Sequence, residues 1–330
     1  MSRRLSLRML LVVAALLALA AKTVYAPDRP VATLTDRWAP PPSRFIPVLN
    51  VLVHIREEGS RRDTLPLVLL HGTSASLHTW DGWAKDLARD RRVIRFDLPA
   101  FGLTGPFPDD DYSPRRYVRF LTALLDSLQL PRAILVGNSF GGELAWSTAV
   151  LAPSRVAGLV LVDAAGYPRA PTSEPIGFRL ARIPVLNKLL TVVLPRSIVA
   201  SSLRSSYGDT TRVTDSLITR YYELTLRAGN RAALPKRMAA PRDDSLMALI
   251  PTVKVPTLIL WGLRDRLILP ANGERFHREI AGSRLVTFDD LGHVPMEEDP
   301  SRTVAAARSF LDERFPVTPA PAPPPAPVKP

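Results

Sequence analysis

One serine stands where a strand should turn sharply into a helix. The segment Gly137–Gly141 (GNSFG) follows an apolar run of strand type, and a helical pattern follows it. Glycine on both sides lets the strand and the helix approach closely and holds the middle residue in a strained, exposed conformation. The hydroxyl of Ser139 would then point into a cleft near the positive end of the helix. The pattern predicts a nucleophilic serine rather than a structural turn.

A nucleophilic serine needs a base and a group that orients the base. The chain has five histidines, and His293 is the candidate because it follows a strand-like run in a loop that contains Gly292. Asp265 and Asp163 both follow strand ends and could orient it. We favour Asp265 because the order serine, aspartate, histidine then falls on successive strand ends. The alternatives are a surface histidine, and an Asp265 that only pairs with a neighbouring arginine.

The elements that must position these residues alternate between strands and helices. Short runs rich in leucine and β-branched residues are typical of strands covered on both faces. These runs are Leu67–Leu70, Val93–Phe96, Ala133–Val136, Val156–Val162, Thr257–Leu260 and Leu285–Phe288, preceded by two strands at Phe45–Leu49 and Val51–Ile55. Alternation of this kind predicts an α/β fold with a mostly parallel central sheet and helices on both faces.

Two helices carry clear start signals. The first is predicted at Pro114–Leu128 with Ser113 as its N-cap, and the second from about Pro300 to Phe315 with Asp299 as its cap. Residues 167–250 instead contain helical segments and no convincing buried strand. Such an insertion would lie over the carboxyl ends of the strands, where ligands bind in open α/β sheets. We therefore expect a helical lid within a domain that spans residues 45–315.

The two ends differ from this domain in composition. Residues 1–26 begin with three arginines, followed by thirteen apolar residues from Met9 to Ala21. This pattern predicts a signal-anchor helix or a cleaved signal peptide. Basic residues before the apolar run favour an N-terminus in the cytoplasm. We therefore expect a membrane-anchored chain with its catalytic domain outside the cytoplasm, or a secreted or periplasmic domain after cleavage.

Proline dominates the segments that flank the domain. Residues 27–44 are predicted to be a Pro-rich linker that separates the domain from the membrane. Residues 316–330 contain eight prolines in fifteen positions and are predicted to be a disordered tail. The tail could be a spacer or a ligand for a proline-recognising partner, and the spacer is favoured.

Composition excludes several classes of protein. The net charge is +12, but the first 26 residues carry four of these charges and the last fifteen carry one, which argues against a nucleic-acid partner. The chain has no cysteine, so thiolate nucleophiles, cysteine zinc sites and disulfides are excluded. It also contains none of the common zinc-protease, P-loop or dinucleotide-binding motifs. We therefore expect neither a metal nor a cofactor, and a small-molecule substrate.

Taken together, these motifs resemble those of α/β-hydrolase-fold serine hydrolases over roughly Phe45 to Phe315. The matching segments, in the family's order, are Leu70–Thr73, Asp97–Thr104, Gly137–Gly142, Trp261–Asp265 and Leu291–His293.

The resemblance implies a role for each candidate residue. Ser139 would be the nucleophile, His293 the general base and Asp265 its orienter. The oxyanion hole would be formed by the backbone N–H of Phe140 and that of Thr73 or Ser74. His71 would be structural.

The resemblance leaves the substrate open. A serine nucleophile argues against the dehalogenase and epoxide hydrolase branches, and a carboxyl-ester hydrolase working through an acyl-enzyme is the first expectation. The alternative is a carbon–carbon bond hydrolase that cleaves ring-fission products. Its substrate would be an acidic dienol, and Arg204, Arg220 or Arg227 of the lid would bind the acidic group. A perhydrolase-like activity, and a non-catalytic binding protein on the same fold, are further alternatives.

Overall fold

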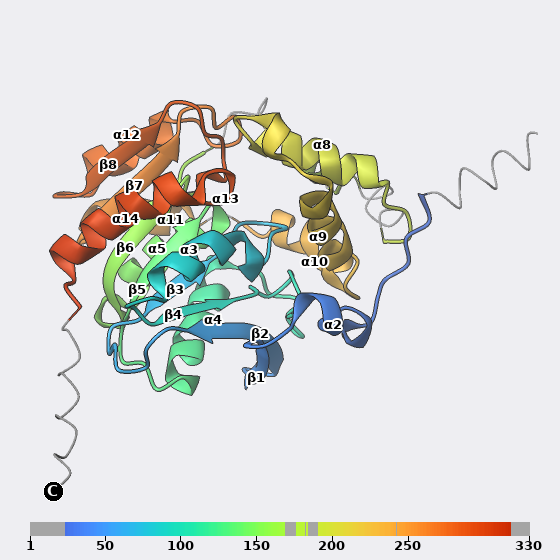
Figure 1. The fold of residues 1–330 in the computed structure, drawn as a ribbon, viewed down its shortest axis with the longest axis horizontal. Helices are drawn as coiled ribbons and strands as arrows, with labels where there is room; N and C mark the ends of the chain where they lie inside the picture. Colours follow the sequence, from blue (N-terminus) through green and yellow to red (C-terminus); the bar gives the residue numbers. More distant parts are fainter. Residues whose placement is uncertain (1–23, 169–175, 182, 184–190, 242, 318–330) are drawn as a thin grey trace, which may run out of the picture.

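The computed structural model describes residues 24–168, 176–181, 183, 191–241 and 243–317. Their centre is an eight-stranded sheet in the order β1-β2-β4-β3-β5-β6-β7-β8 (Figure 1). β1 and β2 pair antiparallel, as do β2 and β4, whereas the remaining pairs are parallel. The strands are β1 (Arg44–Val48), β2 (Val51–Glu58), β3 (Leu67–Leu70), β4 (Val93–Phe96), β5 (Ala133–Asn138), β6 (Val156–Val162), β7 (Thr257–Gly262) and β8 (Arg284–Phe288).

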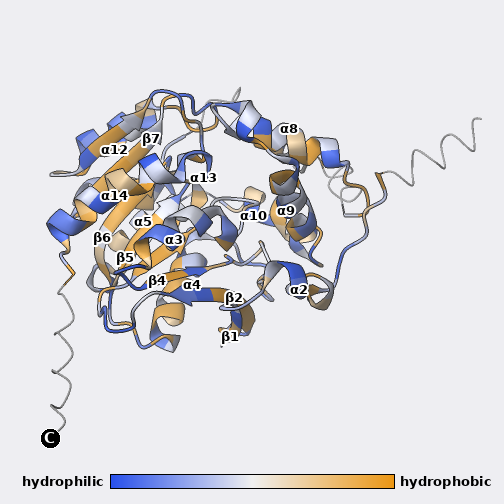
Figure 2. Ribbon diagram, viewed as in Figure 1, coloured by the Kyte–Doolittle hydropathy of each residue, from blue (hydrophilic) through white to orange (hydrophobic). Residues whose placement is uncertain are grey.

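The central strands are apolar throughout because both faces of the sheet are covered. In β3, Val68 and Leu70 belong to one hydrophobic cluster, and Leu67 and Leu69 to the other. Side chains alternate between the faces of a strand, so an unbroken apolar run is buried on both sides. Figure 2 shows these strands in orange, whereas α12 and α14 alternate between orange and blue.

Helices form the two outer layers. α4 (Pro114–Ser127), α5 (Phe140–Leu151) and α12 (Ala271–Glu279) contribute buried side chains to the first cluster. α3 (Asp81–Leu87) and α14 (Pro300–Arg314) contribute to the second. The hydroxyl of Ser113 and the carboxylate of Asp299 cap α4 and α14. The predicted α/β fold with helices on both faces of a mostly parallel sheet is thus confirmed.

The strand boundaries differ from the prediction mainly in β2. This strand continues through Arg56, Glu57 and Glu58, which the sequence pattern left out because they are charged. Ion pairs across the sheet accommodate these charges: Glu58 pairs with Arg95, and Glu57 with Arg92, both on β4 or beside it.

Helices replace strands between β6 and β7. The described helices of this insertion are α6 (Ile176–Ala181), α8 (Arg196–Ser206), α9 (Asp215–Thr225), α10 (Asn230–Ala239) and α11 (Asp244–Met247). Figure 1 shows α8, α9 and α10 at one end of the sheet. The sequence predicted helices here, and the insertion's role as a lid stays a prediction.

The segment before β1 packs against this insertion instead of extending away from the domain. The N–H of Ala26 donates to the carbonyl of Val192, and the N–H of Arg29 donates to that of Leu226. Short helical turns follow at Val31–Thr33 and Thr35–Trp38 (α2), with Leu34 buried between them. A spacer was expected over residues 27–44, but Leu34 of this segment packs against Leu224 of the insertion and Leu103 of the loop after β4.

The prediction of a membrane anchor is overturned. Among the helices of the described residues, none is both long enough and apolar enough to cross a membrane. The apolar run of thirteen residues is also shorter than the ~20 residues that a helical span requires. The predictions of a signal-anchor and of attachment to a membrane are therefore not upheld. The same holds for the cellular locations that were inferred from them. Residues 1–23, and residues 318–330 of the Pro-rich tail with its suggested partner, lie outside the described residues.

Candidate active site

Ser139 lies in the sharp turn between β5 and α5. Its backbone has φ 53° and ψ −116°, a strained conformation for a residue with a side chain. The turn is this tight because strand and helix almost touch: a Cβ on Gly137 would lie 2.2 Å from the carbonyl oxygen of Gly141, and one on Gly141 would lie 2.1 Å from that of Leu70. Only glycine fits at these two positions, and the serine between them faces a cavity.

His293 and Asp265 meet beside this turn. The Nδ1 of His293 lies 2.7 Å from Oδ2 of Asp265. The other carboxylate oxygen of Asp265 accepts hydrogen bonds from the N–H groups of Leu267, at 2.7 Å, and Ile268, at 3.0 Å. These donors fix the carboxylate so that it faces the imidazole. Asp265 therefore pairs with a histidine, which disfavours the alternative of an ion pair with a neighbouring arginine.

Two buried side chains that the sequence analysis missed hold the histidine loop in place. Asn138 donates from Nδ2 to the carbonyls of His293, at 2.9 Å, and Val162, at 3.1 Å. Glu298 accepts from the N–H of Gly292, at 2.8 Å, and from the N–H groups at the start of the loop after α8. Asn138 stands inside the serine motif, and this position was the only signal for its role.

The cavity in front of Ser139 is largely apolar and has a volume of about 160 Å³. Ser139, His293, Thr73 and Ser74 line one side of it. The insertion supplies the apolar wall, with Phe178, Ile198, Leu203 and Leu234 among its side chains. Such a cavity accepts an apolar group and places it against the serine.

The residues expected to form the oxyanion hole either follow Ser139 directly in the chain or line the same cavity. Phe140 is the first residue of α5, and the N–H groups of a first helical turn have no acceptor within the helix. Thr73 and Ser74 lie on the turn after β3 and line the cavity together with Ser139. Ser74 has a φ of 61°, so this turn is also constrained.

His71 and Asp97 connect the turn after β3 to the segment that follows β4. His71 accepts the N–H of Leu98 at Nε2, at 2.9 Å, and therefore donates from Nδ1 to the carbonyl of Gly72, at 2.7 Å. Burial lowers the pKa of His71, which keeps the ring neutral. Asp97 accepts the N–H groups of Leu77 and Leu103. A structural role for His71 agrees with these contacts.

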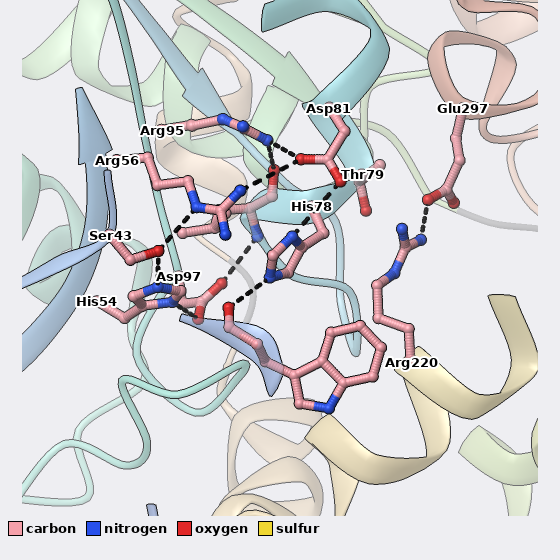
Figure 3. A network of polar contacts seen from close by, with 12 residues as sticks. Ser43, His54, Arg56, His78, Thr79, Asp81, Arg95, Asp97, Arg220 and Glu297 are labelled. Carbon is pink, nitrogen blue, oxygen red and sulfur yellow. Dashed lines mark hydrogen bonds and ion pairs between the residues drawn. The ribbon is translucent and has the colours of Figure 1, made fainter. Parts of the chain in front are cut away.

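Asp97 also belongs to a second serine–histidine–aspartate row, which Figure 3 shows. Its Oδ2 lies 2.7 Å from Nδ1 of His54, and Nε2 of His54 lies 3.0 Å from Oγ of Ser43. Ser43 also accepts a hydrogen bond from Arg56. Ser43 is not among the residues that line the cavity. The row joins the segment before β1 to β2 and β4.

Asp163, the other candidate for the orienting acid, lies at the end of β6. Its Oδ1 accepts the N–H of Gly262 at 3.0 Å. Asp163, Asp265 and His293 each place one oxygen or nitrogen that could bind a metal within 4.8 Å of the other two. Within the described parts of the chain, this is the only group of three or more such side chains. We assign no metal to them, because Nδ1 of His293 and Oδ2 of Asp265 already engage each other.

Comparison with known proteins identifies the family. The family model described as the alpha/beta hydrolase fold matches residues 66–300, more than two thirds of the chain. The chain belongs to the α/β hydrolase family. It is 31% identical, over 257 residues, to 2-hydroxy-6-oxo-2,4-heptadienoate hydrolase of Pseudomonas putida, covering 74% of this chain and 88% of that protein. We therefore call the protein a hydrolase.

Solved structures with this fold include enzymes of both substrate classes considered above. The meta-cleavage product hydrolase of Pseudomonas fluorescens is 26% identical, with a TM-score of 0.70 over 82% of this chain and 97% of that one. A thermophilic esterase of Thermogutta terrifontis is 25% identical, with a TM-score of 0.67 over 82% of this chain and 98% of that one. Both share the fold of this hydrolase, and the alignment covers nearly the whole of each of the two chains.

The arginines that the sequence analysis suggested for an acidic substrate lie elsewhere in the hydrolase. Arg220 forms a partly buried ion pair with Glu297 (Figure 3), and Arg227 donates to the carbonyl of Thr104. Arg204 is exposed, and none of the three arginines lines the cavity. Arg231 of α10 does line it, and its guanidinium lies 2.6 Å from the carboxylate of Asp28. The sequence alone gave no signal for this pair.

Proposed function

We propose that this hydrolase transfers the acyl part of a carbonyl substrate to Ser139 and then to water. His293 takes the proton of Ser139 as the hydroxyl attacks the carbonyl carbon, and Asp265 holds the imidazole in the required tautomer. The N–H groups of Phe140 and of Thr73 or Ser74 stabilise the oxyanion, each worth about 3–4 kcal/mol in such sites. The hydrogen bond between Asp265 and His293 beside the strained serine carries this proposal.

After the attack, the same residues complete the reaction. The bond between the carbonyl carbon and the leaving group breaks, and His293 returns the proton to the leaving group. A water molecule then gives its proton to His293 and attacks the acyl-enzyme, which releases the acid and restores Ser139. No step requires a group outside the chain other than the substrate and water.

We further propose that the bond cleaved is a carbon–carbon bond next to a ketone, in a substrate of the ring-fission-product type. The relatives support this assignment: besides the heptadienoate hydrolase, 2-hydroxymuconate semialdehyde hydrolase of Pseudomonas is 27% identical over 83% of this chain. The cavity adds an arginine, Arg231, beside an apolar wall. Arg231 would face the acidic end of such a substrate, and the apolar wall would contact its apolar acyl end.

A carboxyl ester is the second candidate, and a specific contact favours it. Asp28 accepts hydrogen bonds from Nε of Arg231, at 3.1 Å, and from its Nη2, at 2.6 Å. This carboxylate offsets the positive charge at the cavity, and the rest of the lining is mostly apolar. An uncharged ester would therefore fit without competing with Asp28.

Substrate assays with the purified enzyme distinguish the candidates. We expect a fluorophosphonate to label Ser139, and labelling to be lost in Ser139→Ala and His293→Ala. We expect kcat/KM for a dienoate ring-fission product to exceed that for nitrophenyl esters by at least about tenfold, which corresponds to 1.4 kcal/mol. Higher values for the esters would favour the second candidate. Absence of both labelling and turnover would reject the enzyme and favour a binding protein.

An Asp28→Asn variant tests whether the ion pair sets this preference. Removing the charge of Asp28 should raise kcat/KM for the acidic dienoate several-fold and leave kcat/KM for a neutral ester nearly as it was. An equal change for both substrates would show that Asp28 acts on the fold of the site and not on its charge.

A further inference from the structure

Asp163 is a buried acid next to the proposed catalytic row that the mechanism above does not use. It follows β6 directly, is 0% exposed and has a φ of 44°, in the left-handed region. The carboxyl group reaches the N–H of Gly262 at the end of β7 with Oδ1. It thereby lies against Asp265, which hydrogen-bonds to His293.

The hydrogen bonds around the two acids indicate that one of the two carboxyl groups carries a proton. The second oxygen of Asp163, Oδ2, is buried. If both carboxyl groups are ionised, no donor among the described residues forms a hydrogen bond with this oxygen. A buried oxygen without a partner costs about 1–3 kcal/mol. Two adjacent buried carboxylates also repel each other, which further disfavours ionisation of both. A proton on one of them removes both penalties.

The surroundings assign this proton to Asp163. Asp265 accepts two backbone N–H groups and faces Nδ1 of His293, and such donors favour the charged form of a carboxyl. Asp163 accepts one backbone N–H. The ionisable groups that face Asp163 are Asp265, His293 and, from α13 (Pro295–Glu298), Glu298. Burial raises the pKa of Asp163 well above its ordinary value, and the charge of Asp265 adds to this shift.

We propose that Asp163 is a positioning residue that stays protonated and donates a hydrogen bond to the carboxylate of Asp265. The inference rests on the proposed roles of Ser139, His293 and Asp265. The donated bond orients Asp265 toward His293 and withdraws part of its negative charge. Asp163 does not touch the substrate, and it acts on the reaction through Asp265.

Two substitutions separate this role from the others that Asp163 could have. Asp163→Leu removes the donor, and we expect kcat to fall at least tenfold and the acid limb of the kcat/KM profile to move to higher pH. Asp163→Asn keeps the size, lets the amide donate to Asp265 and lets its oxygen accept from Gly262. We expect it to recover most of the activity lost in Asp163→Leu and to restore the acid limb.

The outcomes that would overturn the proposal are distinct. If Asp163→Asn loses as much activity as Asp265→Asn, Asp163 works as a carboxylate, and the proposal is wrong. If Asp163→Leu folds and keeps both the activity and the pH profile of the wild type, Asp163 positions nothing. The control for both variants is Asp36→Asn, which changes an exposed carboxylate that does not line the cavity.

Two measurements need no substrate, so they hold even if the proposed function fails and even if Asp163→Leu does not fold. We expect the infrared carbonyl band of a protonated, buried carboxyl group in the wild type, and its loss in Asp163→Asn. Because a raised pKa means that folding takes up a proton, the wild type should lose stability as pH rises above about 4, and Asp163→Asn should lose less. Absence of the infrared band, or identical pH slopes, would show that Asp163 is ionised.

Discussion

Ser139 illustrates how one residue can be held in an unfavourable conformation. A left-handed φ on a residue with a Cβ costs of the order of 1–3 kcal/mol. Its N–H donates to the carbonyl of Val162, and its carbonyl accepts the N–H groups of Glu143 and Ala165. The backbone on both sides is therefore pinned by neighbouring elements, and the side chain stays turned toward the cavity. Strain of this kind persists because packing overdetermines the turn.

At the same scale, Asp265 should matter far more than its neighbour. Asp265→Asn replaces the acceptor of His293 Nδ1 with a group that can also donate, which favours the wrong tautomer. We expect kcat to fall by about 10⁴-fold with little change in KM, by analogy with the orienting aspartate of serine proteases. Steady-state kinetics measure this. Asp163→Asn should lose much less, and the reverse order would show that the acids are misassigned.

Among the elements, β5 does more than present the serine. Its last residue, Asn138, ties the end of β6 and the loop after β8 to the strand through Val162 and His293. Glu298 of α13 ties the same loop to the end of α8 through Gly292 and Gly208. The histidine therefore depends on four elements that are far apart in the sequence, and the insertion is one of them.

We expect Asn138→Ala to weaken both the fold and the site. The carbonyl of Val162 keeps the N–H of Ser139 as a donor, but the carbonyl of His293 loses the bond from Asn138. The free energy of unfolding should fall by about 1–3 kcal/mol, and kcat should fall with it, as urea unfolding and kinetics will measure. Asn272→Ala, which removes an exposed hydrogen bond on α12, is the matched control and should change neither. Wild-type stability in Asn138→Ala would contradict this account of the loop.

For the whole molecule, buried acids couple the fold to pH. Asp97 joins β2, the end of β4 and the turn after β3, and it is completely buried. Burial by itself favours its neutral form, but His54 and the backbone donors more than offset this and hold the pKa of Asp97 well below its ordinary value. The stability that ionised Asp97 contributes is therefore complete above the unfolded pKa of about 4 and is lost as pH falls toward the folded pKa.

Acid unfolding should report this contribution. We expect the free energy of unfolding of the wild type to fall steeply below about pH 4. Asp97→Asn should be less stable at neutral pH, but its stability should fall less steeply in acid, because the titrating group is gone. Urea unfolding at a series of pH values measures both slopes. Asp36→Asn should keep the wild-type slope, and an unchanged slope in Asp97→Asn would refute the argument.

Local sequence determined the strands, the capped helices and the serine turn of this hydrolase. Apolar runs such as Val156–Val162, and glycines packed against backbone as in Gly137, follow from short-range chemistry that any reader of the chain can see. The same logic placed His293 and Asp265 on neighbouring strand ends, because the carboxyl ends of parallel strands share one edge. Their hydrogen bond is the geometry that this order predicted.

Only the tertiary structure decided which distant residues meet. The charged end of β2 did not look like a strand in the sequence, and only its ion pairs with Arg92 and Arg95, beside and on β4, explain it. Asp28 and Arg231, which form another ion pair, are 203 positions apart in the chain. An isolated apolar run could be read as a membrane anchor, and the described helices gave that interpretation no support. Asp163 and Asp265 are ordinary aspartates in the sequence. Burial next to each other makes one of them a hydrogen-bond donor, because long-range packing sets the solvent and charge around every group.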